Sequence, residues 1–178
     1  IKRIVNGLNE LKENYKKEII SHQDSLENKI TLLFLEADDL MKRGDLKGAE
    51  KKLVAIISSD SKNIRAFKEL GEIYFEDKNF QDAKQTFEHV LKLAGSDSEI
   101  YFELALIDEA NENMGGGLDN IEKALEIEPN NPRYLDTKLE ISIIKKHKTS
   151  AAGAYEKLKE VNPENQKLEE FKKQIDEI

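Results

Sequence analysis

The sequence predicts an all-α protein built as a solenoid of antiparallel helix pairs. Three observations lead to this prediction: a 34-residue period, apolar residues at helical spacing within each half-period, and a composition rich in charged residues. Charged residues make up 36% and hydrophobic residues 38% of the 178-residue chain, which has only three prolines. This balance is typical of helical proteins. A solenoid tolerates it because each repeat buries its apolar face only against its neighbours.

Residues 1–29 lie before the periodic part and predict a helix of their own, from about residue 2 to residue 20. Its apolar residues are spaced by four, three and four, as along one stripe of a helix: they are Ile4, Leu8, Leu11 and Tyr15. Two roles stay open. The helix could stack on the first repeat as an N-terminal cap, or residues 1–20 could mediate a homodimer. About two heptads are apolar, fewer than a coiled coil uses.

A break in this helix is expected around Ser21–Asp24. Asp24 is followed three residues later by Glu27, which is the pattern of a capping box at a helix start. We therefore expect the first helix of the first repeat to begin near Ser25.

Four registers of 34 residues follow without insertion or deletion, at residues 30–63, 64–97, 98–131 and 132–165. Small residues recur where two helices of a pair would cross closely. Gly44-Asp45 and Lys78-Asn79 each predict the end of one helix and the cap of the next. The second register is the clearest, with Ala66-Phe67, Leu70-Gly71, Tyr74, Phe80, Ala83, Phe87 and Leu91.

This pattern resembles the tetratricopeptide repeat (TPR), in which Leu-Gly and Tyr of a first helix precede Ala and an aromatic residue of a second helix. The resemblance implies four repeats over residues 30–163 in a right-handed superhelix, and a non-catalytic protein–protein interaction scaffold. Residues 164–178 are predicted to form a C-terminal capping helix, since a terminal repeat needs a polar outer face. The apolar stripe of that helix is Leu168, Phe171, Ile175 and Ile178.

The resemblance also implies that the first helices line a concave groove, which binds a peptide or a helix of a partner protein. The best-known binding mode clamps a C-terminal carboxylate through Asn residues. Asp38 and Glu69 stand at those positions and disfavour that mode, because they would repel a carboxylate. The residues expected in the groove are Phe34, Leu35, Asp38, Met41, Lys68, Glu69, Glu72, Phe75, Phe102, Glu103, Leu106, Glu109, Asp136 and Glu140.

The mixture of apolar and acidic side chains in this set suits an amphipathic segment with Lys or Arg along its flanks. Two other interpretations stay open. The acids could be an ordinary solvated face of an acidic protein, or residues 1–20 of the same chain or of a second copy could cover the apolar positions.

The third repeat departs from the family pattern. Asp108 replaces the usual Tyr, and Gly115-Gly116-Gly117 falls where the second helix should begin. Because each glycine costs a helix about 1 kcal/mol relative to alanine, we expect a late start or a frayed first turn there. A phosphate-binding loop is not indicated, because no strand precedes the glycines and no Lys-Ser/Thr follows them.

Composition excludes several function classes. The net charge of −8 disfavours nucleic-acid binding, and no apolar run approaches the roughly 18–20 residues of a membrane span. Cysteine is absent, and His22, His89 and His147 show no ligand spacing, so no cofactor, metal or catalytic site is predicted.

The compartment and the wider context are left open. Because the chain starts at Ile1 rather than Met, we expect a fragment, which could be the regulatory or anchoring region of a larger enzyme or membrane protein. It would be cytoplasmic by default, and membrane-tethered or exported if a segment had been removed from its N-terminus.

Overall fold

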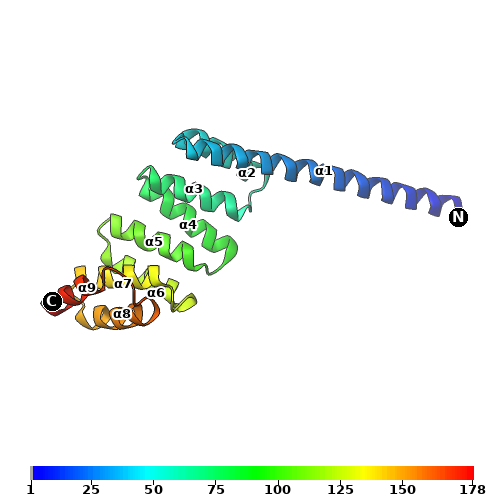
Figure 1. Cartoon of the computed structure of the whole chain (residues 1–178). Coiled ribbons are helices and arrows are strands. Elements are labelled where there is room, and N and C mark those ends of the chain that lie inside the picture. The colour runs from blue at the N-terminus through cyan, green and yellow to red at the C-terminus, as the bar shows by residue number, and fades with distance from the viewer. Residues whose placement is uncertain (1) are drawn as a thin grey trace. The chain divides into compact units, whose positions relative to one another are not determined.

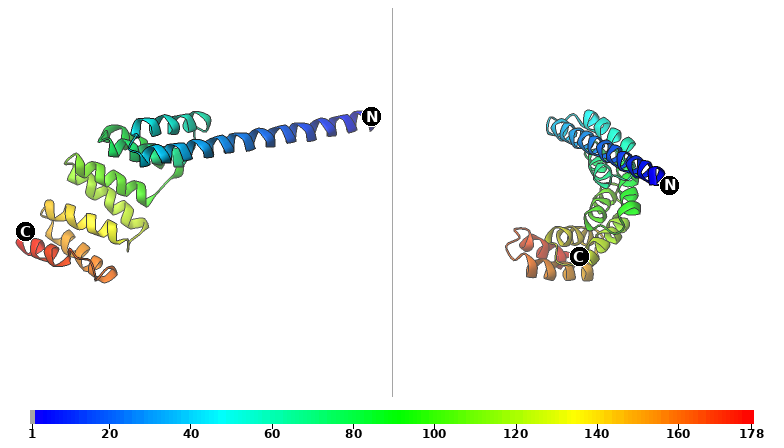
Figure 2. Two further views of the ribbon diagram at one scale, coloured as in Figure 1. Left: turned by 45° about the horizontal axis from the view of Figure 1, so that its top comes forward. Right: turned by 90° about the vertical axis from the view of Figure 1, so that its right-hand side faces the viewer.

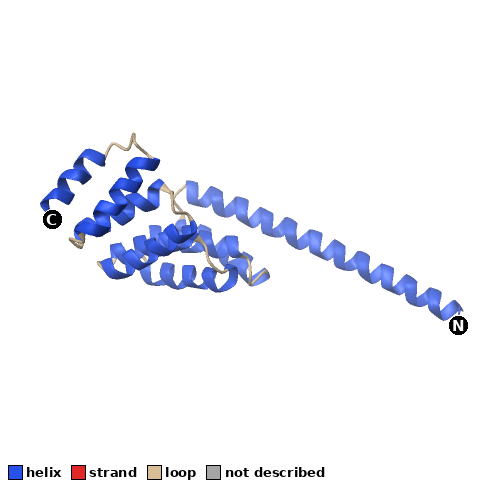
Figure 3. Cartoon of the chain, turned by 90° about the horizontal axis from the view of Figure 1, so that it is seen from below, coloured by secondary structure: helices blue, strands red, loops and turns tan. Residues whose placement is uncertain are grey.

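The computed structural model describes the backbone of residues 2–178 and the side chains of residues 11, 14, 15, 17, 21 and 24–178. Every regular element among these residues is an α-helix, as Figures 1 and 3 show, so the predicted all-α class is confirmed. The helices are α1 (Lys2–Lys42), α2 (Leu46–Ser59), α3 (Ile64–Glu76), α4 (Phe80–Ala94), α5 (Ser98–Ala110), α6 (Met114–Ile127), α7 (Pro132–Ile144), α8 (Lys148–Val161) and α9 (Leu168–Glu177).

The helices begin at 34-residue intervals, which is the period seen in the sequence. First helices of the pairs begin at Ile64, Ser98 and Pro132, and second helices begin at Leu46, Phe80, Met114 and Lys148. The C-terminal part of α1 is the first helix of the first pair.

The turn inside each pair repeats one geometry. The second residue after the first helix has a positive φ, and the next residue donates its amide to a carbonyl five residues earlier, as Asp45 does to Leu40 at 2.9 Å. This closure satisfies carbonyls at the helix end. The residues with positive φ are Gly44, Lys78, Glu112 and Lys146, again 34 apart. Three of the four are not glycine, so the closure holds them in a conformation that costs about 1 kcal/mol each.

The same turns supply most of the caps for the second helices. Asp45 accepts a hydrogen bond from the amide of Gly48 at 2.9 Å, and Asn79 accepts one from Asp82 at 3.5 Å. The predicted turns at Gly44-Asp45 and Lys78-Asn79 are therefore confirmed. His147 takes the corresponding place before α8 without a side-chain cap.

The predicted break around Ser21–Asp24 is wrong, because α1 runs through it as one helix of 41 residues. No glycine or proline occurs between Leu8 and Arg43. Asp and Ser cost a helix interior only a few tenths of a kcal/mol each, so the hydrogen-bond ladder continues through them. The Asp24 and Glu27 pattern is compatible with a helix start, but it does not force one.

The chain divides into two compact units, residues 1–73 and residues 74–178. In the first unit, α2 packs along the C-terminal part of α1, and the N-terminal half of α1 extends beyond α2 (Figures 1 and 2). Ala37 and Ala49, two of the small residues expected at close crossings, are completely buried. Leu53 and Ile56 of α2 are completely buried as well.

The second unit contains two clusters of buried apolar residues. The first joins α5, α6 and α7 through Phe102, Ala105, Ile121, Ala124 and Tyr134. The second joins α7, α8 and α9, and its members from α9 are Leu168, Phe171 and Ile175. Three of the four residues of the apolar stripe predicted for the C-terminal helix are therefore buried, and Ile178 is half-buried, although the helix begins at Leu168 rather than at residue 164.

The predicted late start at Gly115-Gly116-Gly117 is also wrong, because α6 begins at Met114 and contains all three glycines. The reason lies in Asp108, which is only 3% exposed. Its carboxylate accepts hydrogen bonds from Lys84 at 2.6 Å, Asn113 at 3.1 Å and Asn120 at 2.9 Å. Asn113 in turn caps α6 through the amide of Gly116. The two departures of the third repeat thus belong to one polar network.

The network predicts opposite effects for two glycine-to-alanine substitutions. A Cβ atom at Gly116 would lie 2.4 Å from Nδ2 of Asn113 and 2.7 Å from Oδ2 of Asp108, whereas a Cβ atom at Gly153 in α8 would meet nothing within 4 Å. We expect Gly116→Ala to lower the free energy of unfolding by about 1–2 kcal/mol, because buried hydrogen bonds must break. Gly153→Ala should raise it by about 0.5–1 kcal/mol.

Urea unfolding followed by circular dichroism would measure both variants. A Gly116→Ala protein at least as stable as the parent would contradict the role given to the network.

Candidate peptide-binding face

The first helices of the pairs carry all the side chains that the sequence assigned to a groove. Among them Phe34 and Phe102 are buried, at 7% and 3% exposure, whereas Leu35 is 63% exposed. Asp38 and Glu72 are exposed, and the remaining members are half-buried: Met41, Lys68, Glu69, Phe75, Glu103, Leu106, Glu109, Asp136 and Glu140. The two Phe rings are therefore covered rather than presented to solvent.

In the first unit, Phe34 of α1 is covered by Arg65 of α3. The guanidinium carbon lies 4.0 Å from the ring centroid, within the range of a cation–π contact. Nε of Arg65 also binds Oε1 of Glu69 at 2.7 Å. Asp38 pairs along α1 with Lys42 at 2.5 Å. Asp38 and Glu69, which stand where a carboxylate clamp would have Asn, are therefore both paired with cations of the same chain.

In the second unit, Phe102 of α5 is covered in the same way by Arg133 of α7. The guanidinium lies 3.9 Å from the ring centroid, and the ring stacks on Tyr134 at 5.2 Å. Arg133 also binds Glu99 at 2.7 Å and approaches Glu103 at 3.6 Å. The Tyr134 hydroxyl donates to the second oxygen of Glu99 at 3.0 Å. Burial is the main cause that raises the pKa of Tyr134 to about 12.

A third cation lies one repeat further along. Nζ of Lys167, in the segment before α9, is 2.8 Å from Oδ2 of Asp136 and 2.9 Å from Oε1 of Glu140. These hydrogen bonds raise the pKa of Lys167 above its usual value. The sequence prediction did not include Lys167.

The three contacts share one sequence spacing. Arg65, Arg133 and Lys167 each lie 31 residues after the residue that they cover or bind, which is Phe34, Phe102 or Asp136. Reading the aligned repeats for pairs 31 apart would have found Lys167 from the sequence.

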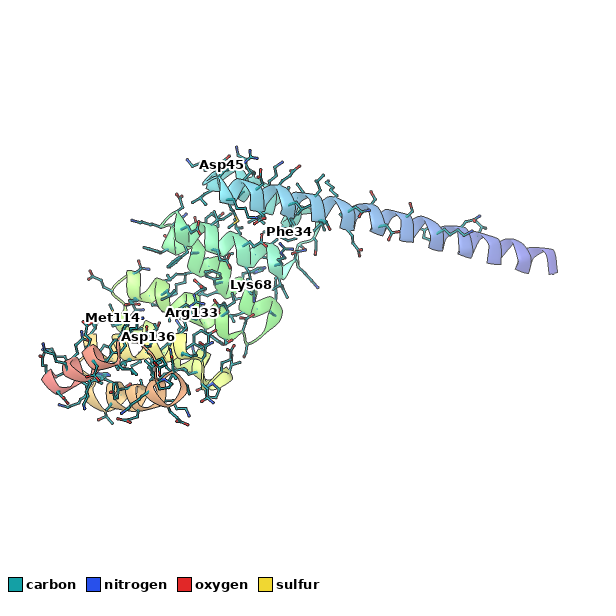
Figure 4. All side chains as sticks on the ribbon, viewed as in Figure 1. Phe34, Asp45, Lys68, Met114, Arg133 and Asp136 are labelled. Atoms are coloured by element: carbon teal, nitrogen blue, oxygen red, sulfur yellow. The ribbon has the colours of Figure 1, made fainter. Side chains whose placement is uncertain are left out.

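We name the surface built by Glu103, Leu106 and Glu109 of α5 and by Arg133, Asp136 and Glu140 of α7 the α5–α7 face. Figure 4 shows Arg133 and Asp136 along α7. Glu109 is half-buried, and this burial, followed by the repulsion of Glu140, raises its pKa. The α5–α7 face therefore holds two carboxylates whose mutual repulsion a further cation would relieve.

No group of three His, Asp or Glu side chains in the described part of the chain could hold a metal ion. Among the described residues, no helix combines the length and the apolar character that crossing a bilayer requires.

The cover that Arg133 provides can be tested by its removal. We expect Arg133→Ala to lower the free energy of unfolding by about 1–2 kcal/mol, because the Phe102 ring loses its cation and Glu99 and Glu103 lose their partner. Arg133→Lys should recover only part of this, since an ammonium cannot stack as a planar group. Arg43→Ala is the matched control, with an expected loss of about 0.3 kcal/mol, because Arg43 makes only an exposed pair with Asp39 on α1. Equal losses for Arg133→Ala and Arg43→Ala in chemical unfolding would refute the covering role.

Comparison with known proteins identifies the repeat. The family model described as a tetratricopeptide repeat matches residues 40–107. No curated protein sequence matches the chain.

Similar solved structures extend the likeness beyond that segment. The MamA protein superposes with a TM-score of 0.73 at 18% identity, over 85% of this chain and 86% of MamA. YrrB, a TPR protein with an unusual peptide-binding site, superposes with a TM-score of 0.67 at 16% identity, over 91% and 90%. The first TPR of Spaghetti (RPAP3), bound to the HSP90 peptide SRMEEVD, superposes with a TM-score of 0.60 at 22% identity, over 65% and 91%. Residues 40–107 thus match the tetratricopeptide-repeat family, and the helix pairs at 34-residue intervals form the solenoid fold that these solved structures share.

Proposed function

We propose that the chain is a non-catalytic protein-interaction scaffold, and that its first helices bind a peptide or a helix of a partner protein. One observation carries this proposal: the α5–α7 face combines carboxylates from two helices with apolar side chains that solvent reaches. Leu106 is half-buried, and Ile144, one turn beyond Glu140 on α7, is 55% exposed. An apolar patch rimmed by charges is typical of an interaction surface.

The charge of this surface indicates the chemistry of the partner. The first helices α5 and α7 carry five carboxylates in this region: Glu99, Glu103, Glu109, Asp136 and Glu140. Two cations, Arg133 of α7 and Lys167 from the segment before α9, pair with carboxylates of this set. The surplus is negative, so it favours an amphipathic segment whose polar side carries Lys or Arg. The peptide SRMEEVD bound by the Spaghetti domain carries three acidic residues and one Arg, so its net charge is negative and we do not expect this face to bind a ligand of that kind.

Binding can be measured with a synthetic amphipathic helix of Leu and Lys, about 18 residues or five turns long, and with a matched peptide that carries Glu in place of Lys. We expect the Lys peptide to bind and the Glu peptide not to bind in fluorescence anisotropy. Glu109→Lys should weaken binding about tenfold or more, because it places a cation on the face where the peptide presents one. Glu177→Lys, at the exposed end of α9, is the matched control and should bind like the parent. Equal binding of both peptides would refute the proposal.

A second candidate function is self-assembly through the N-terminal part of α1. Its supporting observation is that Leu11 and Tyr15 are 67% and 69% exposed, one turn apart on the same side of the helix. The helix is about 60 Å long, whereas α2 has only 14 residues. A second copy could cover this stripe.

Substitution within the stripe tests this candidate on the full chain. If α1 mediates assembly, light scattering over a concentration series should show a mass that rises with concentration. The double variant Leu11→Glu, Tyr15→Glu should then stay monomeric, because two charges would be buried against the partner helix. Asn14→Glu, a nearby exposed position, should assemble like the parent. A parent chain that is monomeric at every concentration would exclude this function.

A further inference from the structure

We propose that Lys167 is an internal substitute for a cationic side chain of the partner: it fills the Asp136–Glu140 position of the α5–α7 face in the free protein and is displaced when a partner binds. The inference rests on the proposed function, which it deepens by naming the residue that the partner must displace.

The geometry at Asp136 and Glu140 is that of a bound cation. The two carboxylates lie one helical turn apart on α7, and the single ammonium of Lys167 bridges them at 2.8 and 2.9 Å. Lys167 reaches them from the turn segment between α8 and α9. A Lys or Arg of a bound segment would make the same bonds from solvent.

The other two cations at the 31-residue spacing are held differently. Arg65 and Arg133 lie within helices α3 and α7, and each covers a Phe ring that is less than 8% exposed. Their departure would open apolar side chains to water, which costs free energy. Lys167 has carboxylates in place of the Phe ring, and its own side chain is 52% exposed. Its ammonium also lies 5.8 Å from the ring centroid of Phe171, near the 6 Å limit of a cation–π contact, so its departure removes a weaker aromatic contact than the departure of Arg65 or Arg133 would.

The free energy of the contact also favours exchange. Exposed ion pairs contribute little to stability, because the attraction is screened and two long side chains must be ordered. Breaking the Lys167 ion pairs therefore costs a partner that supplies an equivalent cation little free energy. The favourable free energy of binding comes from the apolar contacts beside the site.

One unsatisfied atom indicates which cation fits best. Oδ1 of Asp136 is buried and accepts no hydrogen bond, although Lys167 binds the other oxygen of the same carboxylate. A guanidinium presents several N–H donors in a fixed plane and can bind both oxygens of one carboxylate. We therefore expect the position to prefer Arg of the partner over Lys.

The test uses the amphipathic Leu/Lys peptide and its Leu/Arg counterpart on the full chain. Lys167→Met keeps the length of the side chain and removes the charge. It should bind both peptides about two- to fivefold more tightly than the parent, the range that an exposed ion pair is worth. Lys172→Met, on the exposed side of α9, is the matched control and should leave affinity unchanged. The parent should bind the Arg peptide more tightly than the Lys peptide.

Further variants separate displacement from a structural role. Asp136→Asn with Glu140→Gln should weaken binding of both peptides, and Lys167→Arg should bind no more tightly than the parent. If Lys167 only supports α9, Lys167→Met would lower the unfolding midpoint without tightening binding, which overturns this inference alone. Failure of every variant to bind either peptide would overturn the proposed function and this inference with it.

Discussion

The left-handed residue in each hairpin turn is the constraint on which the rest of the structure depends. Gly44, Lys78, Glu112 and Lys146 reverse the chain at the same point of every repeat. The closing hydrogen bonds fix how the second helix leaves the first. Because these reversals are equally spaced, equivalent residues of successive first helices take equivalent places. A contact that works once can therefore recur in a later repeat.

The contact between residues 31 apart recurs with different types of side chain. Twice the pair is Arg over a buried Phe, and once it is Lys on two carboxylates. The backbone supplies the separation and the facing direction, while the side chains decide whether the contact is part of the core or an exchangeable surface pair. This difference sets Lys167 apart from Arg65 and Arg133.

Much of the fold could be predicted from the sequence, because a strict period constrains every repeat at once. The turns at Gly44-Asp45 and Lys78-Asn79 were identified in this way, and the apolar stripe of the last helix was identified from its helical spacing. The expected break at Ser21–Asp24 failed because a capping box describes what can start a helix, and nothing in that stretch stops one. The expected fraying at Gly115–Gly117 failed because propensity is local, whereas the network around Asp108 includes Lys84, 24 residues away.

The candidate site was less predictable than the fold. Its residues were assigned to the correct helices, but the covering of Phe102 and the pairing of Asp136 depend on side chains from the next repeat. A column of aligned repeats shows which positions are equivalent, and it does not show which columns touch. Lys167 was missed for this reason.

The buried carboxylate of Asp108 limits how freely the repeats can be recombined. Its cation, Lys84, belongs to the preceding repeat. At the position equivalent to Lys84, the other repeats carry Glu50, Leu118 and Ala152. A shuffled array that placed the third repeat behind any repeat but the second would bury a charge without its partner. The second and third repeats therefore have to stay adjacent in any such rearrangement.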